Sequence, residues 1–314
     1  MIPSQSPLFY GCATALVTPF RGGEVDREAF VRLLRFQLDP SAEDRPAALV
    51  VCGTTGESPT LTDKEKQWLF TTAVREVRAS DRPALPVIAG TGSNNTHRAA
   101  ELSRLAEACG ADGLLAVTPY YNKASEAGLI GHYEAITSAV GLPLMIYHVP
   151  SRTGCRMPPE VCRILSEDPQ IVGIKDATGD LSFTARVAAL CGDALPIYGG
   201  NDDQTVPVLS LGGLGVISVV SNLLPERMSR LCRLWREGRV AEAAAEQLAL
   251  LPLCDALFCE VNPIPVKAGM AMLGLCSEEV RLPLAAADDR VKERVANALR
   301  RHGSGERGEC TSDK

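Results

Sequence analysis

The sequence predicts an α/β fold, a (β/α)8 barrel with a helical C-terminal extension. Short apolar runs recur about eight times between residues 14 and 219, and each is followed by a helical pattern. Such alternation is typical of parallel strands joined by helical crossovers. A TIM barrel typically needs ~250 residues, which this chain can supply. An open doubly wound sheet is the alternative, but no GxGxxG motif follows the first apolar run.

The apolar runs and the patterns between them define the expected elements in chain order. Strands are predicted at residues 14–17, 47–52, 87–89, 113–117, 144–147, 171–175, 196–198 and 215–219. Helices are predicted at residues 28–38, 97–109, 126–140, 181–190 and 226–235. A further helix is expected after Thr62-Asp63-Lys64-Glu65, which resembles a capping box.

After the eighth strand the chain becomes almost wholly helical, which predicts the domain organisation. Residues 1–225 are expected to form the catalytic barrel, and residues 226–302 a helical region that includes a helix at 240–251. Residues 303–314 are polar and rich in glycine, so we expect a disordered tail there.

Composition limits the possible functions. A formal net charge of -6 argues against nucleic acid or an anionic membrane as the main partner. No apolar stretch approaches transmembrane length and no secretory signal opens the chain, which predicts a cytoplasmic protein. The 11 cysteines are scattered without CxxC spacing, so neither a disulfide nor a metal site is predicted.

In a barrel, the active site lies at the carboxyl ends of the strands, and Lys175 ends the predicted sixth strand. Burial there would lower the pKa of the lysine and leave its amine free to attack a carbonyl, which is how a Schiff-base lysine arises. The alternative is a surface lysine just past a strand.

A glycine- and hydroxyl-rich segment, GTTGES at residues 53–58, follows the second predicted strand. Its backbone N–H groups and hydroxyls could surround an anion such as a carboxylate. It lacks the lysine of a P-loop. A tight turn that caps the next helix would explain the same residues equally well.

Other strand ends carry tyrosines and an arginine. Tyr120 and Tyr121 follow the fourth strand and Tyr147 ends the fifth, so three of the six tyrosines fall at these two positions. A tyrosine can relay protons, although packing at a barrel rim is its commoner role. Arg152 could clamp a carboxylate or could be an exposed loop residue. His148 is interpreted as a packing or hydrogen-bonding residue.

Taken together, these segments resemble the dihydrodipicolinate synthase family of pyruvate-dependent class I aldolases, from about residue 11 to about residue 303. The motifs that carry the resemblance are GTTGES at 53–58, IAGTGSNNT at 88–96, VTPYYNK at 117–123, YHVPSRTG at 147–154, GIKDATG at 173–179, GGNDDQ at 199–204, GGLGVISV at 212–219 and NPIPVK at 262–267. Their joint order and spacing are the evidence, since none is decisive alone.

The resemblance implies four catalytic residues. Lys175 would form the Schiff base with pyruvate. Tyr147, Thr55 and Tyr121 would form a proton relay, with Tyr121 reaching into the site of a neighbouring subunit across a tight dimer interface. The family is usually a homotetramer built as a dimer of dimers.

The resemblance also implies the residues that bind substrate. Thr54 and Thr55 would hold the pyruvate carboxylate, and Arg152 would bind the carboxylate of the second substrate, L-aspartate 4-semialdehyde. Gly200 and Ile217 would line the pocket.

The implied activity is a Schiff-base lyase that condenses these two substrates in lysine and diaminopimelate biosynthesis, with no metal or organic cofactor. N-acetylneuraminate lyase and 2-keto-3-deoxy sugar-acid aldolases share Lys175 and the TTGE-type loop, but they need no arginine tuned to the semialdehyde. The SRTG segment at 151–154 therefore favours the synthase. A non-catalytic sensor or scaffold is disfavoured because the key residues are intact.

One departure from the family concerns feedback. Members inhibited by L-lysine bind it beside the position of Tyr120, with a histidine where this chain has Lys66 and an acid where it has Arg98. Two cations would repel a cationic effector, which predicts weak or absent inhibition. Asn94 and Ser58 still match the family pattern.

Overall fold

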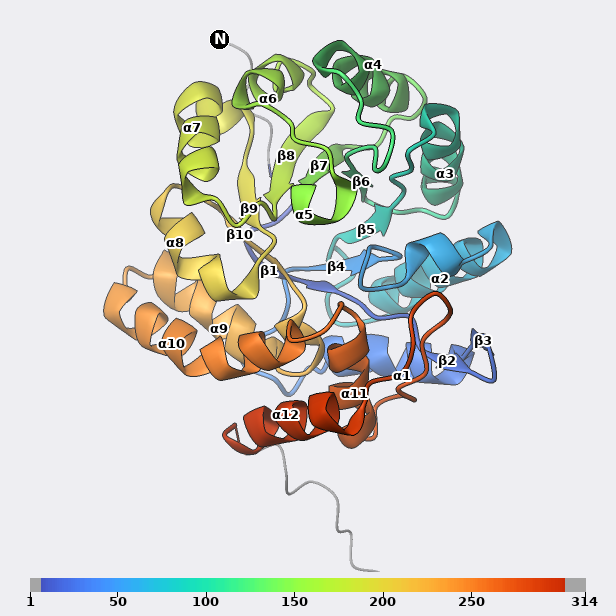
Figure 1. Ribbon diagram of the computed structural model, residues 1–314, viewed down its shortest axis with the longest axis vertical. Coiled ribbons are helices and arrows are strands. Elements are labelled where there is room, and N and C mark those ends of the chain that lie inside the picture. The colour runs from blue at the N-terminus through green and yellow to red at the C-terminus, as the bar shows by residue number, and fades with distance from the viewer. Residues whose placement is uncertain (1–6, 303–314) are drawn as a thin grey trace, which may run out of the picture.

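A closed barrel of eight parallel strands forms the centre of the computed structural model, which describes residues 7–302 (Figure 1). The strand order β1-β10-β9-β8-β7-β6-β5-β4 confirms the predicted fold. The barrel strands are β1 (Gly11–Ala15), β4 (Ala48–Val51), β5 (Val87–Gly90), β6 (Gly113–Val117), β7 (Leu144–His148), β8 (Ile171–Asp176), β9 (Ile197–Gly199) and β10 (Gly215–Ser218).

Helices surround the barrel, and most lie where the periodicity predicts them. Those that follow strands β1 to β9 are α1 (Arg27–Gln37), α2 (Asp63–Arg78), α3 (Thr96–Ala108), α4 (Glu126–Thr137), α5 (Pro150–Thr153), α6 (Pro159–Leu165), α7 (Leu181–Cys191) and α8 (Thr205–Ser210). The short helices α5, α6 and α8 were not predicted, nor was the two-stranded hairpin of β2 (Phe20–Arg21) and β3 (Glu24–Val25).

The first strand begins three residues and ends two residues earlier than the predicted 14–17. Gly11 pairs with Gly215 across the seam of the barrel, and a Cβ on Gly215 would come within 1.8 Å of the Gly11 carbonyl oxygen. The apolar run continues after the strand ends at Ala15, where the Val17 N–H donates to the Asn222 side chain instead. A close backbone approach leaves no hydrophobic signal, so the apolar pattern placed this strand too late.

The C-terminal region is helical, as expected, and lies along one side of the barrel (Figure 1). It contains α9 (Pro225–Arg236), α10 (Val240–Leu257), α11 (Ile264–Met272) and α12 (Asp289–Arg300). The predicted end of α10 at residue 251 is wrong because the helix continues through Pro252. Leu253 and Leu257, beyond that proline, are buried among the other C-terminal helices, and this packing supports the extra turns.

Buried side chains form three clusters. One fills the space between the barrel and helices α1 to α7, and a second joins β1 and β10 to the C-terminal helices. The third lies inside the barrel and includes Tyr147, Tyr198 and Ile217. Lys175 is paired in register with Tyr147 and Tyr198, so it shares their inward-facing positions.

No helix within residues 7–302 is long and apolar enough to cross a membrane. The ten cysteines in this part of the chain are free, and its residues contain no group of three or more His, Cys, Asp or Glu side chains suited to a metal ion. The predicted disordered tail at 303–314 lies outside the described residues.

Candidate active site

Lys175 is buried at the carboxyl end of β8, with only 6% of its surface exposed. Its Nζ atom lies 4.4 Å from the centroid of the Tyr147 ring, on the neighbouring strand β7. The interpretation of Lys175 as a surface lysine is therefore wrong. The structure brings a primary amine and a tyrosine together inside the mouth of the barrel.

The residue after Lys175 holds this strand end in place. The Asp176 carboxylate accepts hydrogen bonds from the Thr178 N–H at 2.9 Å, the Thr178 hydroxyl at 2.7 Å and the Thr184 hydroxyl at 2.6 Å. Three donors satisfy this buried carboxylate. Asp176 therefore fixes the backbone that carries Lys175.

The GTTGES segment forms a tight loop after β4. Cys52 and Glu57 both adopt positive φ angles, 57° and 52°, and such left-handed backbone in residues other than glycine marks strained, often functional positions. A Cβ on Gly56 would come within 3.2 Å of the Leu16 carbonyl oxygen. A side chain at position 56 would therefore press against this carbonyl group unless the backbone shifted by a few tenths of an ångström.

The two threonines of this loop differ in exposure. Thr55 is buried, and its hydroxyl oxygen accepts a hydrogen bond from the Asn262 side chain at 2.9 Å. Thr54 is half-buried and lines a cavity. Asn262 was not predicted as a partner of Thr55, although it begins the NPIPVK motif at 262–267.

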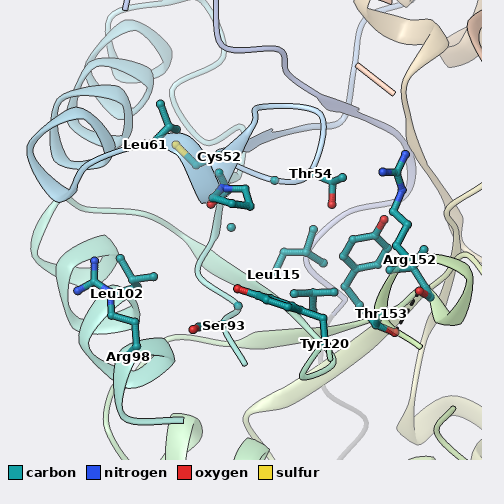
Figure 2. A pocket seen from close by; sticks show the side chains of 18 of the residues that line it. Cys52, Thr54, Leu61, Ser93, Arg98, Leu102, Leu115, Tyr120, Arg152 and Thr153 are labelled. Carbon is teal, nitrogen blue, oxygen red and sulfur yellow. Dashed lines mark hydrogen bonds between the residues drawn. The ribbon is translucent and has the colours of Figure 1, made fainter. Parts of the chain in front are cut away.

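A cavity of about 380 Å3 opens at the mouth of the barrel, and Thr54, Tyr147 and Arg152 line it together with Tyr120 (Figure 2). Arg152 is exposed, and its guanidinium donates to the Asn262 carbonyl at 3.4 Å. Figure 2 shows Thr54 and Arg152 at one end of the pocket and Arg98 at the other. The structure thus brings a threonine, a tyrosine and an arginine of the predicted site to one cavity.

The other predicted site residues do not line this cavity. Ile217 lies within β10, one residue before the strand ends, and its side chain is fully buried in the barrel interior. The Gly200 N–H donates to the Asp176 carbonyl at 2.7 Å, and a Cβ there would come within 2.6 Å of the Ala177 Cβ. Gly200 thus lets β9 approach the strand end that carries Lys175, and its contact with substrate stays a prediction.

Tyr121 lies apart from the buried site residues. Its side chain is 88% exposed, its φ is +71°, and its N–H donates to the Thr153 carbonyl at 3.1 Å. A strained backbone that presents an exposed aromatic ring is unusual for a residue with no function. Within one chain, Tyr121 does not join Thr55 and Tyr147.

The far end of the cavity carries the two cations that distinguish this chain. Lys66 is buried and donates to the Ser58 carbonyl at 2.8 Å and to the Ser58 hydroxyl, and burial lowers the pKa of its ammonium group. Arg98 instead pairs with Asp63 and Glu101. Both cations are present as predicted, but of the two only Arg98 forms ion pairs with carboxylates of the described residues.

His148 packs within the core, as interpreted from the sequence. It accepts a hydrogen bond from the Met157 N–H at 3.4 Å, and its ring lies 5.1 Å from that of Phe183. Burial lowers the pKa of His148 to about 4, so the ring is neutral near pH 7.

A closed barrel with a buried lysine beside a tyrosine at one strand end, and a hydroxyl-rich loop after another strand, is typical of a lyase of the class I aldolase type. Comparison with known proteins makes the assignment specific. The model of the dihydrodipicolinate synthetase family matches residues 8–302. The chain belongs to this family.

Named relatives agree. The 4-hydroxy-tetrahydrodipicolinate synthase of Citrifermentans bemidjiense is 46% identical over 278 residues, covering 88% of this chain and 93% of the relative. That of Caldicellulosiruptor saccharolyticus is also 46% identical and covers 95% of this chain and 98% of the relative. The predicted family, its lyase class and the synthase function in lysine and diaminopimelate biosynthesis are thereby confirmed.

Solved structures show the same fold. The dihydrodipicolinate synthase of Thermotoga maritima matches with a TM-score of 0.90 at 41% identity, covering 95% of this chain and 99% of that one. A structure described as the first monomeric dihydrodipicolinate synthase variant also matches with a TM-score of 0.90 at 41% identity, covering 94% and 97% of the two chains.

Proposed function

We propose that this site condenses pyruvate with L-aspartate 4-semialdehyde, with Lys175 as the nucleophile. The observation that carries this proposal is the position of Lys175, buried at the carboxyl end of β8 with its Nζ atom 4.4 Å from the centre of the Tyr147 ring. A buried amine has little water to displace before it attacks a carbonyl carbon.

The chemistry follows from the amine. Lys175 attacks the keto carbon of pyruvate, water leaves, and the resulting iminium draws electrons from the methyl group. Loss of a methyl proton gives an enamine, whose carbon attacks the aldehyde of the second substrate. The amino group of that substrate then displaces Lys175 by transimination and closes the ring. Each carbon–carbon or carbon–nitrogen step is accompanied by a proton transfer.

Three hydroxyl groups are suited to those proton transfers. We assign them to Tyr147 and Thr55 of one subunit and to Tyr121 of its neighbour. The hydrogen bond from Asn262 leaves the Thr55 hydroxyl hydrogen free to point elsewhere. Thr54 and Thr55 would hold the pyruvate carboxylate.

Arg152 is the residue we assign to the second substrate. It lines the same cavity as Thr54 and Tyr147, and a guanidinium can bind a carboxylate through two parallel hydrogen bonds. Gly200 and Ile217 would complete the pocket behind Lys175. This assignment favours the semialdehyde over the substrates of N-acetylneuraminate lyase and the sugar-acid aldolases, which need no arginine tuned to the semialdehyde.

We also propose that the chain works as a homo-oligomer, at least a tight dimer and by family analogy a tetramer. The exposed, strained Tyr121 supports a partner that covers it. A cytoplasmic location is proposed with it, because the confirmed function belongs to amino-acid biosynthesis.

A coupled assay tests the proposed function. Purified protein receives pyruvate, L-aspartate 4-semialdehyde and dihydrodipicolinate reductase, and the consumption of NADPH is followed. Wild type is expected to turn over, whereas Lys175→Ala should lose activity by at least about 1,000-fold because the nucleophile is gone. If wild type fails here but borohydride still traps pyruvate on Lys175, the aldolase class holds and the semialdehyde is the wrong substrate.

A further inference from the structure

A buried ion pair ties the loop of residues 53–58 to the C-terminal region. The Lys267 Nζ atom, on α11, lies 2.6 Å from a Glu57 carboxylate oxygen, and the two side chains are 0% and 1% exposed. The two residues belong to the GTTGES and NPIPVK motifs, yet neither has a part in the proposed chemistry. Lysine and glutamate are almost never buried so completely unless they are paired, and removal of either partner leaves an uncompensated charge in the core.

The remaining contacts of the pair also lead to the C-terminal region. The second carboxylate oxygen of Glu57 accepts from the Arg281 N–H at 2.9 Å. Lys267 Nζ also donates to the Glu279 carbonyl at 2.5 Å and lies 4.2 Å from the centroid of the Phe20 ring. Both oxygens of the carboxylate are therefore held, and the segment around Arg281 lies against α2 and the hairpin β2–β3 (Figure 1).

The segment just before α11 holds the loop of residues 53–58 at a second point. Asn262, two residues before α11, donates to the Thr55 hydroxyl oxygen at 2.9 Å. Glu57 has a φ of +52°, a conformation that persists only where the surroundings enforce it. Two attachments on the α11 side, one on each side of Gly56, set both the position of the loop and the direction of the Thr55 side chain.

We propose that Glu57 and Lys267 are positioning residues, which hold Thr54 and Thr55 where the Schiff base on Lys175 needs them. The C-terminal helices are then part of the active-site framework. This inference rests on the proposed function of Lys175 and Thr55. It adds residues that touch no substrate and act through the loop that carries the threonines.

Glu57→Gln is the direct test. Glutamine keeps the size of the side chain and an acceptor for the Arg281 N–H, but it removes the charge that Lys267 needs. Two readouts separate the steps: borohydride trapping of pyruvate measures the Schiff base, and deuterium exchange of the pyruvate methyl group, followed by NMR, measures proton removal. Trapping at saturating pyruvate is expected to stay complete, while exchange slows at least about tenfold because the relay hydroxyl is misplaced.

Asp44→Asn is the matched control. Asp44 pairs with Arg233 through two hydrogen bonds of 2.6 and 2.9 Å, just before β4 at the amino end of the barrel. Its loss should lower the thermal unfolding midpoint without slowing exchange. Wild-type exchange in fully trapped Glu57→Gln would overturn the proposal, as would equal slowing in Asp44→Asn.

A double variant covers the case in which Glu57→Gln does not fold. Glu57→Gln with Lys267→Met removes both charges and leaves no unpaired ammonium in the core. The positioning role predicts a folded protein that traps pyruvate and exchanges slowly, whereas recovery of the wild-type exchange rate would overturn it. If wild type traps and exchanges but gives no product with the semialdehyde, only the proposed second substrate fails. If wild type neither traps nor exchanges, both proposals fail.

Discussion

Three lysines are buried within residues 7–302, and their neighbours give them different roles. Lys267 pairs with Glu57, so its charge is compensated. Lys66 donates to the carbonyl and hydroxyl of Ser58. Lys175 faces the ring of Tyr147. Burial alone therefore does not identify a nucleophile, and the groups within reach of the amine decide what it can do.

Among single residues, Arg152 is predicted to select the second substrate. Arg152→Ala should lower kcat/KM for L-aspartate 4-semialdehyde by about 10- to 100-fold, the cost of losing hydrogen bonds to a carboxylate. Borohydride trapping of pyruvate should be unchanged. Arg156→Ala, an exposed arginine four residues later, is the control and should resemble wild type. Equal losses for pyruvate and the semialdehyde would contradict this assignment.

Lys66 is predicted to weaken feedback by L-lysine. The ammonium groups of Lys66 and of the effector would repel each other, and within residues 7–302 no carboxylate forms an ion pair with Lys66 as Asp63 and Glu101 do with Arg98. Millimolar L-lysine should therefore leave the initial rate within about twofold of the uninhibited rate. Strong inhibition of wild type would refute this prediction.

Two variants distinguish the effects of Lys66 and Arg98 on inhibition by L-lysine. Lys66→His should increase inhibition by L-lysine more than Arg98→Glu does, because the Arg98 charge is already balanced. The order of the two inhibition constants is the measurement, and the reverse order would show that Arg98 dominates.

At the scale of elements, the start of α2 is stabilised both by a local capping box and by an ion pair with a residue distant in sequence. Thr62 and Glu65 form the predicted capping box, with hydrogen bonds of 3.3 and 2.8 Å between side chains and backbone N–H groups. Glu65 also pairs with Arg281 at 2.5 Å. The Arg281 hydrogen bond lowers the pKa of Glu65 to about 2. One carboxylate thus starts a helix and fastens the C-terminal region to it.

This carboxylate gives a pH prediction. Because the folded-state pKa of Glu65 is below its unfolded value, the stabilisation is complete above about pH 5 and fades as the pH falls toward 2. Glu65→Gln should cost about 1 kcal/mol of unfolding free energy at pH 7, and the difference from wild type should shrink on acidification. Urea unfolding at several pH values measures it.

Glu126→Gln is the control for the capping effect. Glu126 occupies the first turn of α4 and is exposed. Its replacement should change stability by no more than about 0.5 kcal/mol at pH 7. A Glu65→Gln cost that does not vary with pH would show that the ion pair with Arg281 contributes nothing.

At the scale of the whole molecule, the described chain buries Lys175 but exposes Tyr121. If Tyr121 serves the neighbouring subunit, two inactive variants should rescue each other. Refolding an equal mixture of Lys175→Ala and Tyr121→Phe should restore roughly a quarter of wild-type activity, since half the dimers are mixed and each has one complete site.

The separate variants provide the baseline for this experiment. Each should be folded by circular dichroism and should show little turnover alone, and size-exclusion chromatography should give the same elution volume as wild type. A mixture no more active than the sum of its parts would place Tyr121 in the site of its own chain, or outside catalysis altogether.

Local pattern accounts for most of the barrel. Strand β6 has the predicted bounds and β7 and β8 end one residue later than predicted, because buried parallel strands are continuous apolar runs. The start of β1 was predicted too late because its first pairing depends on Gly11 and Gly215, which carry no hydrophobic signal. The short helices after β7 and β9 were missed for a related reason, as they span too few residues for a period to register.

The fold, the family and the lysine at the strand end could all be predicted from the amino-acid sequence, because periodicity and motif spacing are properties of the chain. Which distant residues meet became known from the folded molecule. The contacts of Thr55 with Asn262 and of Glu57 with Lys267 join residues more than 200 positions apart. Arg98 of α3 pairs with Asp63 of the neighbouring helix α2 and with Glu101 of its own helix. Such contacts depend on how the barrel and its helices pack in three dimensions, which no local pattern encodes.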